Sequence, residues 1–355
     1  MKLSPHLTRT LRGIAVFGAA VPLAMCAPAP AYLLSAPSSG PSYVSAASPA
    51  PEVAGHAVSE HVIVISIDGL RADAIEAAGA ATLSRLMKEG AYSLQARTIL
   101  PSITLPSHTS MLTGATPEMH GVLWNDERID ELGVIETPTM FAIARTAGYH
   151  TAAFFSKPKF QHLMAAGTLD YAQAPEGNGR WYAGYTTESV ERYLDEHRPN
   201  LMFVHIGEPD YAGHTIGWGS MVYRWAVRRA DGAVGRILKK ADDAFGEGNF
   251  TVIVTADHGG HGRTHGTEAV QDVTIPWIAW GKGVDGGTVL PEGIRTFDTA
   301  ATALGLLGLE LPADHAGRPV RAAFDAWEDA PTYAGSSPAA GATSAGVAPA
   351  TASPN

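Results

Sequence analysis

The sequence of 355 residues has few cysteines, no excess of positive charge and no long apolar stretch. Cys26 is the only cysteine, and its loss with a signal peptide would leave the mature chain without a disulfide. The formal net charge of −10 argues against binding to nucleic acid or to an anionic membrane. With 45% hydrophobic residues, a chain of this length can still bury one large core or two modest ones.

The apolar run at residues 13–25 is too short to cross a bilayer, which takes about 20 residues. It follows three cationic residues and precedes the sequence APA, which ends at Ala31. We therefore predict a secretory signal at residues 1–31, a secreted or periplasmic protein, and no transmembrane segment in the mature chain. Lipid attachment at Cys26 is the alternative, but Met25 is a poor residue before a lipidated cysteine.

Segments rich in serine, proline and alanine flank the central part of the chain at residues 32–57 and 329–355. Because both lack the apolar density that folding requires, we predict a flexible linker and a low-complexity tail. The predicted catalytic domain is therefore residues 58–328.

Five short apolar runs in this domain are typical of fully buried strands, and helix-like segments such as residues 81–90 and 223–242 separate them. The runs are residues 61–67, 150–155, 201–206, 250–256 and 275–280. This order predicts an α/β fold, namely a doubly wound, mostly parallel sheet with helices on both faces. The chain has no internal repeat.

Three of these runs lead into an aspartate: Asp68, Asp210 and Asp257. Open α/β sheets bind ligands at the carboxyl ends of their strands, so we expect the three carboxylates to converge. Three clustered negative charges repel one another unless cations neutralise them. Two histidines lie close by in the sequence, because His214 follows Asp210 by four residues and His258 directly follows Asp257.

A single aspartate at a strand end is most often a cap or turn residue, and a lone histidine is usually structural. The whole set instead predicts a metal site. Aspartate and histidine ligands without cysteine favour zinc over manganese, iron or cobalt and argue against calcium.

The sequence TLPSHTSMLTG begins at Thr104 and has the pattern of a helix, because Pro106 fits a first turn and Gly114 fits an end. Thr104 would then lie beside the positive end of the helix dipole. That environment stabilises an alkoxide or a phosphoryl oxygen, which makes Thr104 a candidate nucleophile. The alternative is an ordinary helix-capping hydroxyl.

The motifs SIDGLR, TLPSHTSMLTG, HGVLWN, EPDYAGH and TADHGGHGRTHG occur in this order over about residues 60–320. Together they resemble the alkaline phosphatase superfamily, specifically its type I phosphodiesterase/nucleotide pyrophosphatase family. The resemblance implies an alkaline-phosphatase-like fold, two divalent metal ions, and hydrolysis of a small phosphate ester or nucleotide.

The resemblance also implies a role for each site residue. One metal ion, which activates the nucleophile, would be held by Asp68, Thr104, Asp257 and His258. The other would be held by Asp210, His214 and His265. Thr104 would attack phosphorus to form a phosphoenzyme, and Asn125 would donate a hydrogen bond to a non-bridging phosphoryl oxygen.

Some assignments stay open at this stage. His261 competes with His265 as the last ligand or supports it from outside, and Asn125 could be a plain turn residue. His108 and His120 lie inside the motifs, but we expect both to be structural.

The kind of ester is also open. The family resemblance favours a diester or pyrophosphate, whereas Lys157 and Lys159 in SKPKF resemble a pair that meets the extra anionic oxygen of the substrate in related monoesterases and phosphonate hydrolases. Ile103 stands where many eukaryotic relatives have lysine, so the substrate subsite is expected to differ.

Three other classes are disfavoured. A sulfatase needs cysteine or serine in a Cys-x-Pro-x-Arg type motif, and TLPSH has threonine in that position and no such arginine. A phosphoglycerate-mutase-like transferase usually carries a large inserted domain, for which the stretch between Thr104 and residue 201 leaves little room. A non-catalytic binding protein would have lost a ligand, and none of the seven is missing.

Overall fold

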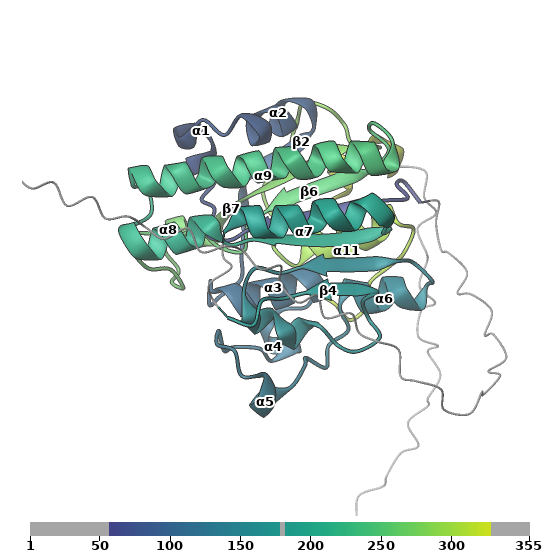
Figure 1. The fold of residues 1–355 in the computed structure, drawn as a ribbon, viewed down its shortest axis with the longest axis horizontal. Coiled ribbons are helices and arrows are strands. Elements are labelled where there is room, and N and C mark those ends of the chain that lie inside the picture. Colours follow the sequence, from purple (N-terminus) through teal and green to yellow (C-terminus); the bar gives the residue numbers. More distant parts are fainter. Residues whose placement is uncertain (1–56, 178–181, 328–355) are drawn as a thin grey trace, which may run out of the picture. The chain divides into compact units, whose positions relative to one another are not determined.

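The structure is a computed structural model, and it describes residues 57–177 and 182–327. The predicted signal peptide, all but the last residue of the predicted linker, and the predicted tail lie outside the described residues. These domain boundaries therefore stay predictions. Within residues 57–327 the strands and helices alternate along the chain, as an α/β fold requires (Figure 1).

Eight strands form one sheet in the order β4-β3-β5-β1-β6-β7-β2-β8. The strands are β1 (Val62–Ile67), β2 (Ala91–Arg97), β3 (Thr151–Phe154), β4 (Tyr171–Gln173), β5 (Leu201–Ile206), β6 (Thr251–Thr255), β7 (Thr274–Gly281) and β8 (Thr288–Val289). Strand β7 is antiparallel to both of its neighbours, β6 and β2, and the other paired strands are parallel. The predicted mostly parallel sheet is confirmed.

Helices cover both faces of this sheet (Figure 1). The long helix α9 contacts α1, α2, α7 and α8, whereas α3, α6 and α11 contact one another. These helices are α1 (Ala74–Ala78), α2 (Ala81–Glu89), α3 (Thr104–Thr113), α6 (Met140–Thr146), α7 (Ala183–Glu196), α8 (Glu208–Ile216), α9 (Met221–Phe245) and α11 (Asp298–Leu306). Shorter elements are α4 (Pro117–His120), α5 (Ile129–Leu132), the 3-10 helix η1 (Pro158–Leu163), α10 (Val270–Val273), η3 (Arg321–Ala323) and η4 (Asp325–Trp327).

The central strands have apolar side chains on both faces because both faces are covered. Every residue of β1, β5 and β6 is buried. Helix α9 buries one stripe at helical spacing, which includes Val227, Ala230, Val234 and Ile237. In the part of the chain that is described, no helix combines the length and the apolar character needed to cross a membrane.

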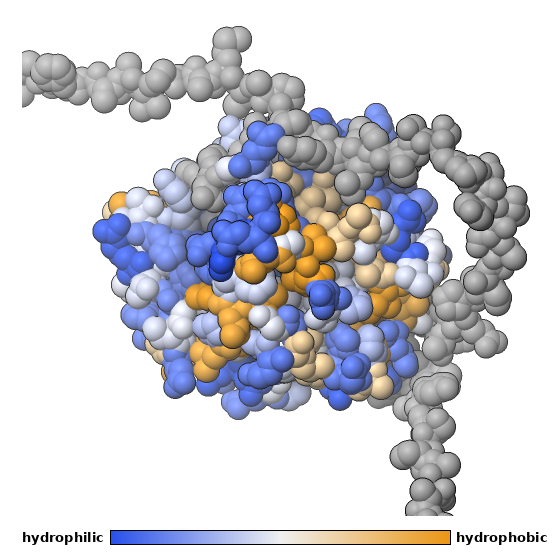
Figure 2. All heavy atoms as spheres, turned by 90° about the horizontal axis from the view of Figure 1, so that it is seen from below, coloured by the Kyte–Doolittle hydropathy of each residue, from blue (hydrophilic) through white to orange (hydrophobic). Residues whose placement is uncertain are grey.

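The segment around α4 and α5 has several exposed apolar side chains. Figure 2 shows the fold from below, where apolar patches interrupt a largely hydrophilic surface. Leu123, Leu132 and Val134 are exposed in this segment. Asn125, Asp126 and Glu127, which lie in the same segment, line the cavity described below.

The sheet order places β1 between β5 and β6, so the loops that follow these three strands are neighbours. After β1 the chain turns at Gly69, whose φ is 70°. A Cβ atom at this position would lie 2.9 Å from the Asp210 Cα atom on α8. Only glycine fits both the backbone conformation and this close approach.

Candidate metal centre and active site

The three aspartates predicted to converge lie at the carboxyl ends of adjacent strands. Asp68 follows β1, Asp257 follows β6, and Asp210 lies in the first turn of α8, which begins directly after β5. Asp68 and Asp257 are fully buried, and Asp210 is 4% exposed. Burial of this kind is costly for carboxylates unless partners compensate their charge.

Lys157 is the partner shared by two of these carboxylates. Its Nζ atom lies 2.6 Å from Asp68 Oδ2 and 2.7 Å from Asp210 Oδ2. Asp68 Oδ2 also accepts a hydrogen bond of 2.9 Å from the Nε2 atom of His205. One oxygen of each carboxylate is therefore already supplied with donors.

The third carboxylate follows the same pattern. Asp257 Oδ1 accepts backbone hydrogen bonds from Gly69 at 3.1 Å and from His258 at 2.9 Å. The other oxygen of each aspartate, namely Asp68 Oδ1, Asp210 Oδ1 and Asp257 Oδ2, is buried and has no hydrogen-bond partner. Buried polar atoms are rarely left unpaired, so three such atoms in one place fit a bound cation.

Three histidines present their free nitrogens to the same place. In each ring the Nδ1 atom is hydrogen-bonded to a backbone carbonyl, which leaves Nε2 without a proton in the neutral ring. The pairs are His258 with Gly259 at 2.8 Å, His265 with Ser102 at 2.9 Å, and His214 with Arg263 at 3.2 Å. This arrangement is typical of histidines that bind a metal through Nε2.

Two groups of these residues present atoms that lie within 4.8 Å of one another, and Asp257 belongs to neither, although its Oδ2 atom lies 3.2 Å from His258 Nε2. One group is Asp210, His214 and His265, and the other is Asp68, Asp210 and His258. The Nε2 atoms of His214 and His265 are 3.0 Å apart, where two lone pairs would repel without a cation between them. Nitrogen ligands about 2.0–2.1 Å from a tetrahedral zinc ion lie about 3.3 Å apart, so this donor set fits such an ion.

The electrostatics of the site reflect the crowding of negative charge. Burial raises the pKa of Asp257 well above its ordinary value, and the charge of Asp68 adds to this effect. The pKa of Asp68 is well below its ordinary value because Lys157, followed by His205, outweighs the effect of burial. Burial lowers the pKa of His258 and lowers that of His265 to about 4, so both rings are neutral at pH 7.

The candidate nucleophile lies at the start of α3, as predicted. Thr104 is the first residue of the helix, and Gly114 ends it with a φ of 73°. The hydroxyl Oγ1 atom lies 3.4 Å from His258 Nε2. Asn125 Oδ1 accepts a 2.9 Å hydrogen bond from the backbone N–H of Leu105, so its amide NH2 group remains for another acceptor.

The two predicted lysines differ in their surroundings. Lys157 is paired with Asp68 and Asp210, whereas no hydrogen bond or ion pair joins the Lys159 ammonium group to any residue in the described ranges 57–177 and 182–327. Burial lowers the pKa of Lys159 to about 8, and the charge of Lys157 adds to the effect. Lys159 is therefore a cation that is poorly compensated by the protein.

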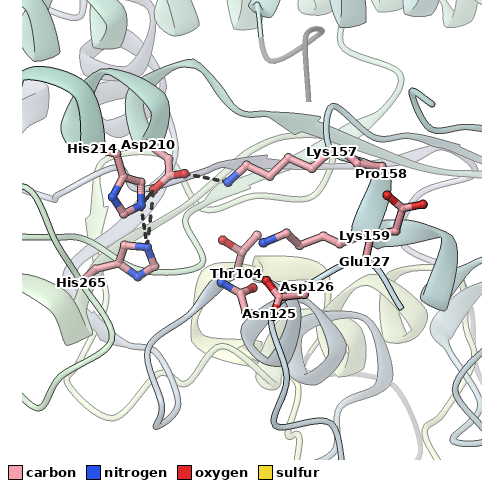
Figure 3. A pocket seen from close by; sticks show the side chains of 10 residues that line it. All are labelled: Thr104, Asn125, Asp126, Glu127, Lys157, Pro158, Lys159, Asp210, His214 and His265. Atoms are coloured by element: carbon pink, nitrogen blue, oxygen red, sulfur yellow. Dashed lines mark hydrogen bonds and ion pairs between the residues drawn. The ribbon is translucent and has the colours of Figure 1, made fainter. Parts of the chain in front are cut away.

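These residues line one cavity of about 270 Å³ (Figure 3). In the close-up, Lys159 points toward Thr104 and Asn125, whereas Asp210, His214 and His265 lie together at the left. The lining residues are Thr104, Asn125, Asp126, Glu127, Lys157, Pro158, Lys159, Asp210, His214 and His265. The cavity thus combines a hydroxyl, an amide, cations and candidate metal ligands.

His261 does not belong to either ligand group. Its Nδ1 atom bonds to Asp272 Oδ1 at 2.7 Å, and backbone hydrogen bonds between His261 and Thr264 form a tight turn in both directions. This turn directs His261 toward Asp272, whereas His265 after it reaches the cavity. The structure therefore favours His265 over His261.

The other histidines of the motifs are hydrogen-bonded at both ring nitrogens, as structural histidines are. His108 bonds to Ser66 Oγ and to the Thr104 carbonyl, each at 2.8 Å. His120 bonds to Ser110 Oγ at 2.9 Å and accepts from the Val122 backbone at 3.0 Å.

Sequence reasoning missed His205, a buried histidine within the apolar run of β5. It also did not foresee that Lys157 would pair with two carboxylates. The only sequence signal for His205 is a polar residue inside the run LMFVHI, which does not reveal its partner.

A family model described as type I phosphodiesterase / nucleotide pyrophosphatase matches residues 62–271. The chain is similar to ectonucleotide pyrophosphatase/phosphodiesterase family member 1 of Homo sapiens, with 26% identity over 217 residues covering 56% of this chain and 23% of that protein. The chain spans about a quarter of the length of the curated relatives it matches.

Two solved structures share the fold. Murine ectonucleotide pyrophosphatase / phosphodiesterase 5, solved as an inactive form in complex with AMP, has a TM-score of 0.62 at 15% identity and covers 72% of this chain and 96% of its own. A 2-O GAG sulfatase has a TM-score of 0.60 at 15% identity, covering 74% of this chain and 73% of its own. These likenesses confirm the predicted alkaline-phosphatase-like fold.

The family model covers more than half of the sequence, and its range contains each of the seven candidate metal ligands. The chain belongs to the type I phosphodiesterase / nucleotide pyrophosphatase family.

Proposed function

We propose that the protein is a secreted phosphoric ester hydrolase that depends on two metal ions, for which zinc is the best fit. It acts on a phosphodiester or nucleotide pyrophosphate through a covalent phosphothreonine. The observation that carries the proposal is the position of the Thr104 hydroxyl, which shares a cavity with Asp210, whose Oδ1 atom has no hydrogen-bond partner, and with His214 and His265, whose Nε2 atoms lie 3.0 Å apart. Family membership supports the same reaction class.

Asp68, Thr104, Asp257 and His258 would hold one ion, and Asp210, His214 and His265 would hold the other. When bound, such ions stabilise the charge on the attacking and leaving oxygens of an in-line displacement. The fit rests on the unpaired carboxylate oxygens and on the three Nε2 atoms described above.

Thr104 and Asn125 carry out the remaining steps. The Thr104 hydroxyl gives up its proton, and Oγ1 forms a bond to phosphorus while the bond from phosphorus to the departing oxygen breaks. The departing group takes up a proton and leaves. Water then attacks the phosphothreonine, the bond between phosphorus and Oγ1 breaks, and Thr104 regains its proton. Throughout, the free NH2 group of Asn125 can donate to a non-bridging oxygen.

The preferred ester is a diester or pyrophosphate, which the family match and the AMP complex of the murine structural neighbour support. A phosphomonoester or phosphonate is the second candidate, favoured by one observation. Lys159 faces the nucleophile without a compensating partner in the described residues, and such a cation helps a dianionic phosphoryl group more than a monoanionic one (Figure 3).

The test compares kcat/KM for an aryl phosphate and for its methyl diester, using metal-free protein and protein loaded with zinc. We expect activity only in the loaded protein and a preference for the diester. Asp210→Ala and Asp257→Ala should each reduce bound zinc and turnover, because each removes an anionic ligand from a different ion. Full activity of a demonstrably metal-free protein would contradict the proposal.

Export is a separate part of the proposal and has its own test. Amino-terminal sequencing of the protein recovered outside the cytoplasm should begin at residue 32. Recovery of uncleaved protein from the cytoplasm alone would contradict secretion without affecting the proposed chemistry.

A further inference from the structure

One of the candidate ligands is held by a chain of buried hydrogen bonds. Asp68 Oδ2 accepts from Lys157 at 2.6 Å and from His205 Nε2 at 2.9 Å, whereas Asp68 Oδ1 has no hydrogen-bond partner. The free Oδ1 atom faces His258 Nε2 at 3.4 Å. The two donors therefore fix which oxygen of this carboxylate is available.

His205 can donate in only one way. It is completely buried on β5, and each of its two ring nitrogens faces one partner. Its Nδ1 atom lies 2.7 Å from Ser156 Oγ. Because the Asp68 carboxylate can only accept, the ring proton is on Nε2, and Nδ1 then accepts a hydrogen bond from the Ser156 hydroxyl.

The surroundings prevent the ring from turning. His205 packs against Phe160, with ring centroids 4.5 Å apart, and against His108 at 4.9 Å. Ser156 is also buried, and it directly precedes Lys157, the other donor to Asp68. Two consecutive residues after β3 thus control both hydrogen bonds to the same oxygen.

We propose that His205, whose other ring nitrogen is held by Ser156, is a positioning residue that keeps Asp68 Oδ2 occupied and leaves only Oδ1 for a metal ion. This inference rests on the proposed metal-dependent function. Hydrogen bonds of this kind to a metal ligand typically change metal affinity by about 10–100-fold when removed.

The test is a zinc titration of the metal-free protein, with affinity and stoichiometry read by competition with a chromophoric chelator. In His205→Leu, we expect one of the two zinc ions to bind about 10–100-fold more weakly and the other to bind as in the wild type. His205→Gln retains an N–H for Asp68 and should recover most of the affinity. Ser156→Ala should give a smaller loss than His205→Leu, because Nδ1 then lacks its partner and the ring is held less firmly, while Nε2–H can still donate to Asp68.

The chain offers a matched control in His120, a buried histidine bonded to the hydroxyl of Ser110 but outside the cavity lining. His120→Leu and Ser110→Ala should leave both zinc affinities unchanged. If His205→Leu does not fold, His205→Gln and Ser156→Ala decide the question in the same titration.

The outcomes distinguish a failure of the proposed function from a failure of the positioning role of His205. A wild-type protein that binds no zinc would overturn the proposed function itself. A wild-type protein that binds two ions, with affinities unchanged in His205→Leu and Ser156→Ala, would overturn only the positioning role. Equal weakening of both ions in these variants would also overturn it, because the effect would then be a general loss of structure.

Discussion

Replacing Lys157 with methionine tests whether this lysine acts as the counter-charge of the metal-free site. The side chain is 13% exposed and bridges two aspartates whose side chains are 0% and 6% exposed. Removing one partner of a buried ion pair typically costs about 3–5 kcal/mol. We expect the free energy of unfolding of metal-free Lys157→Met to fall by that amount, since methionine keeps the apolar stem and removes only the charge.

Zinc should offset much of this loss, because a bound cation would neutralise the same two carboxylates. If zinc removes about 2 kcal/mol of the cost, linkage requires the variant to bind zinc about 30-fold more tightly than the wild type. Urea unfolding followed by tryptophan fluorescence, with chelator and with saturating zinc, measures both quantities. A direct zinc titration checks the predicted gain in affinity.

Lys159→Met is the matched control, because the same substitution two residues later removes a lysine that has no ion pair within the described part of the chain. It should change the stability of the metal-free protein by less than about 1 kcal/mol. If both substitutions lowered the free energy of unfolding by the same small amount, Lys157 would not be the counter-charge of the metal-free site. If saturating zinc did not reduce the loss of stability in Lys157→Met, the lysine and the metal ion would not compensate the same charge.

Three further predictions concern the chemistry of the site. Thr104→Ala should lower kcat by about three orders of magnitude or more with zinc still bound, whereas Thr104→Ser should retain part of the activity; a near-wild-type rate in Thr104→Ala would point to direct attack by water. Zinc affinity should weaken as pH falls, because the raised pKa of Asp257 lets a proton compete for this ligand at a higher pH than it would for an ordinary aspartate. Calorimetric titrations over a series of pH values check this, and an affinity independent of pH would contradict it. Lys159, whose pKa is about 8, is charged below that pH and neutral above it. The ratio of kcat/KM for an aryl monoester to that for its methyl diester should therefore fall between pH 7 and 9, and a similar fall in Lys159→Ala would exclude Lys159 as the cause.

The strands that position the site were predictable because they are buried on both faces. The apolar runs at residues 61–67, 201–206 and 250–256 correspond to β1, β5 and β6 within one residue at either end. Strands β2, β4 and β8 were missed, since β2 mixes polar and apolar residues and the other two have three and two residues. The antiparallel direction of β7 was also not predictable, because the composition of an apolar run does not indicate whether the strand is parallel or antiparallel to its neighbours.

The candidate ligands were predictable for a related reason, because aspartates that follow parallel strands end at one edge of a sheet. The sequence could not reveal side-chain contacts between residues that are far apart along the chain or that depend on the local path of the backbone. The choice between His261 and His265 depends on the turn at His261–Thr264, and the role of His205 depends on Asp68, which lies 137 residues earlier. The pairing of Lys157 depends in the same way on β1 and α8, two elements that are remote in sequence.

The charge of the cavity explains why binding of a phosphate ester should depend on metal. The three aspartates outnumber the single lysine that pairs with them, so the metal-free site repels a phosphoryl group and instead raises the pKa of Asp257. Two divalent ions would add four positive charges and reverse the sign of the site. Lys159 adds a further cation on the opposite side of the cavity, close to Thr104 (Figure 3). A dianionic substrate gains more from each added cation than a monoanionic one, so we expect Lys159 to favour a monoester over a diester.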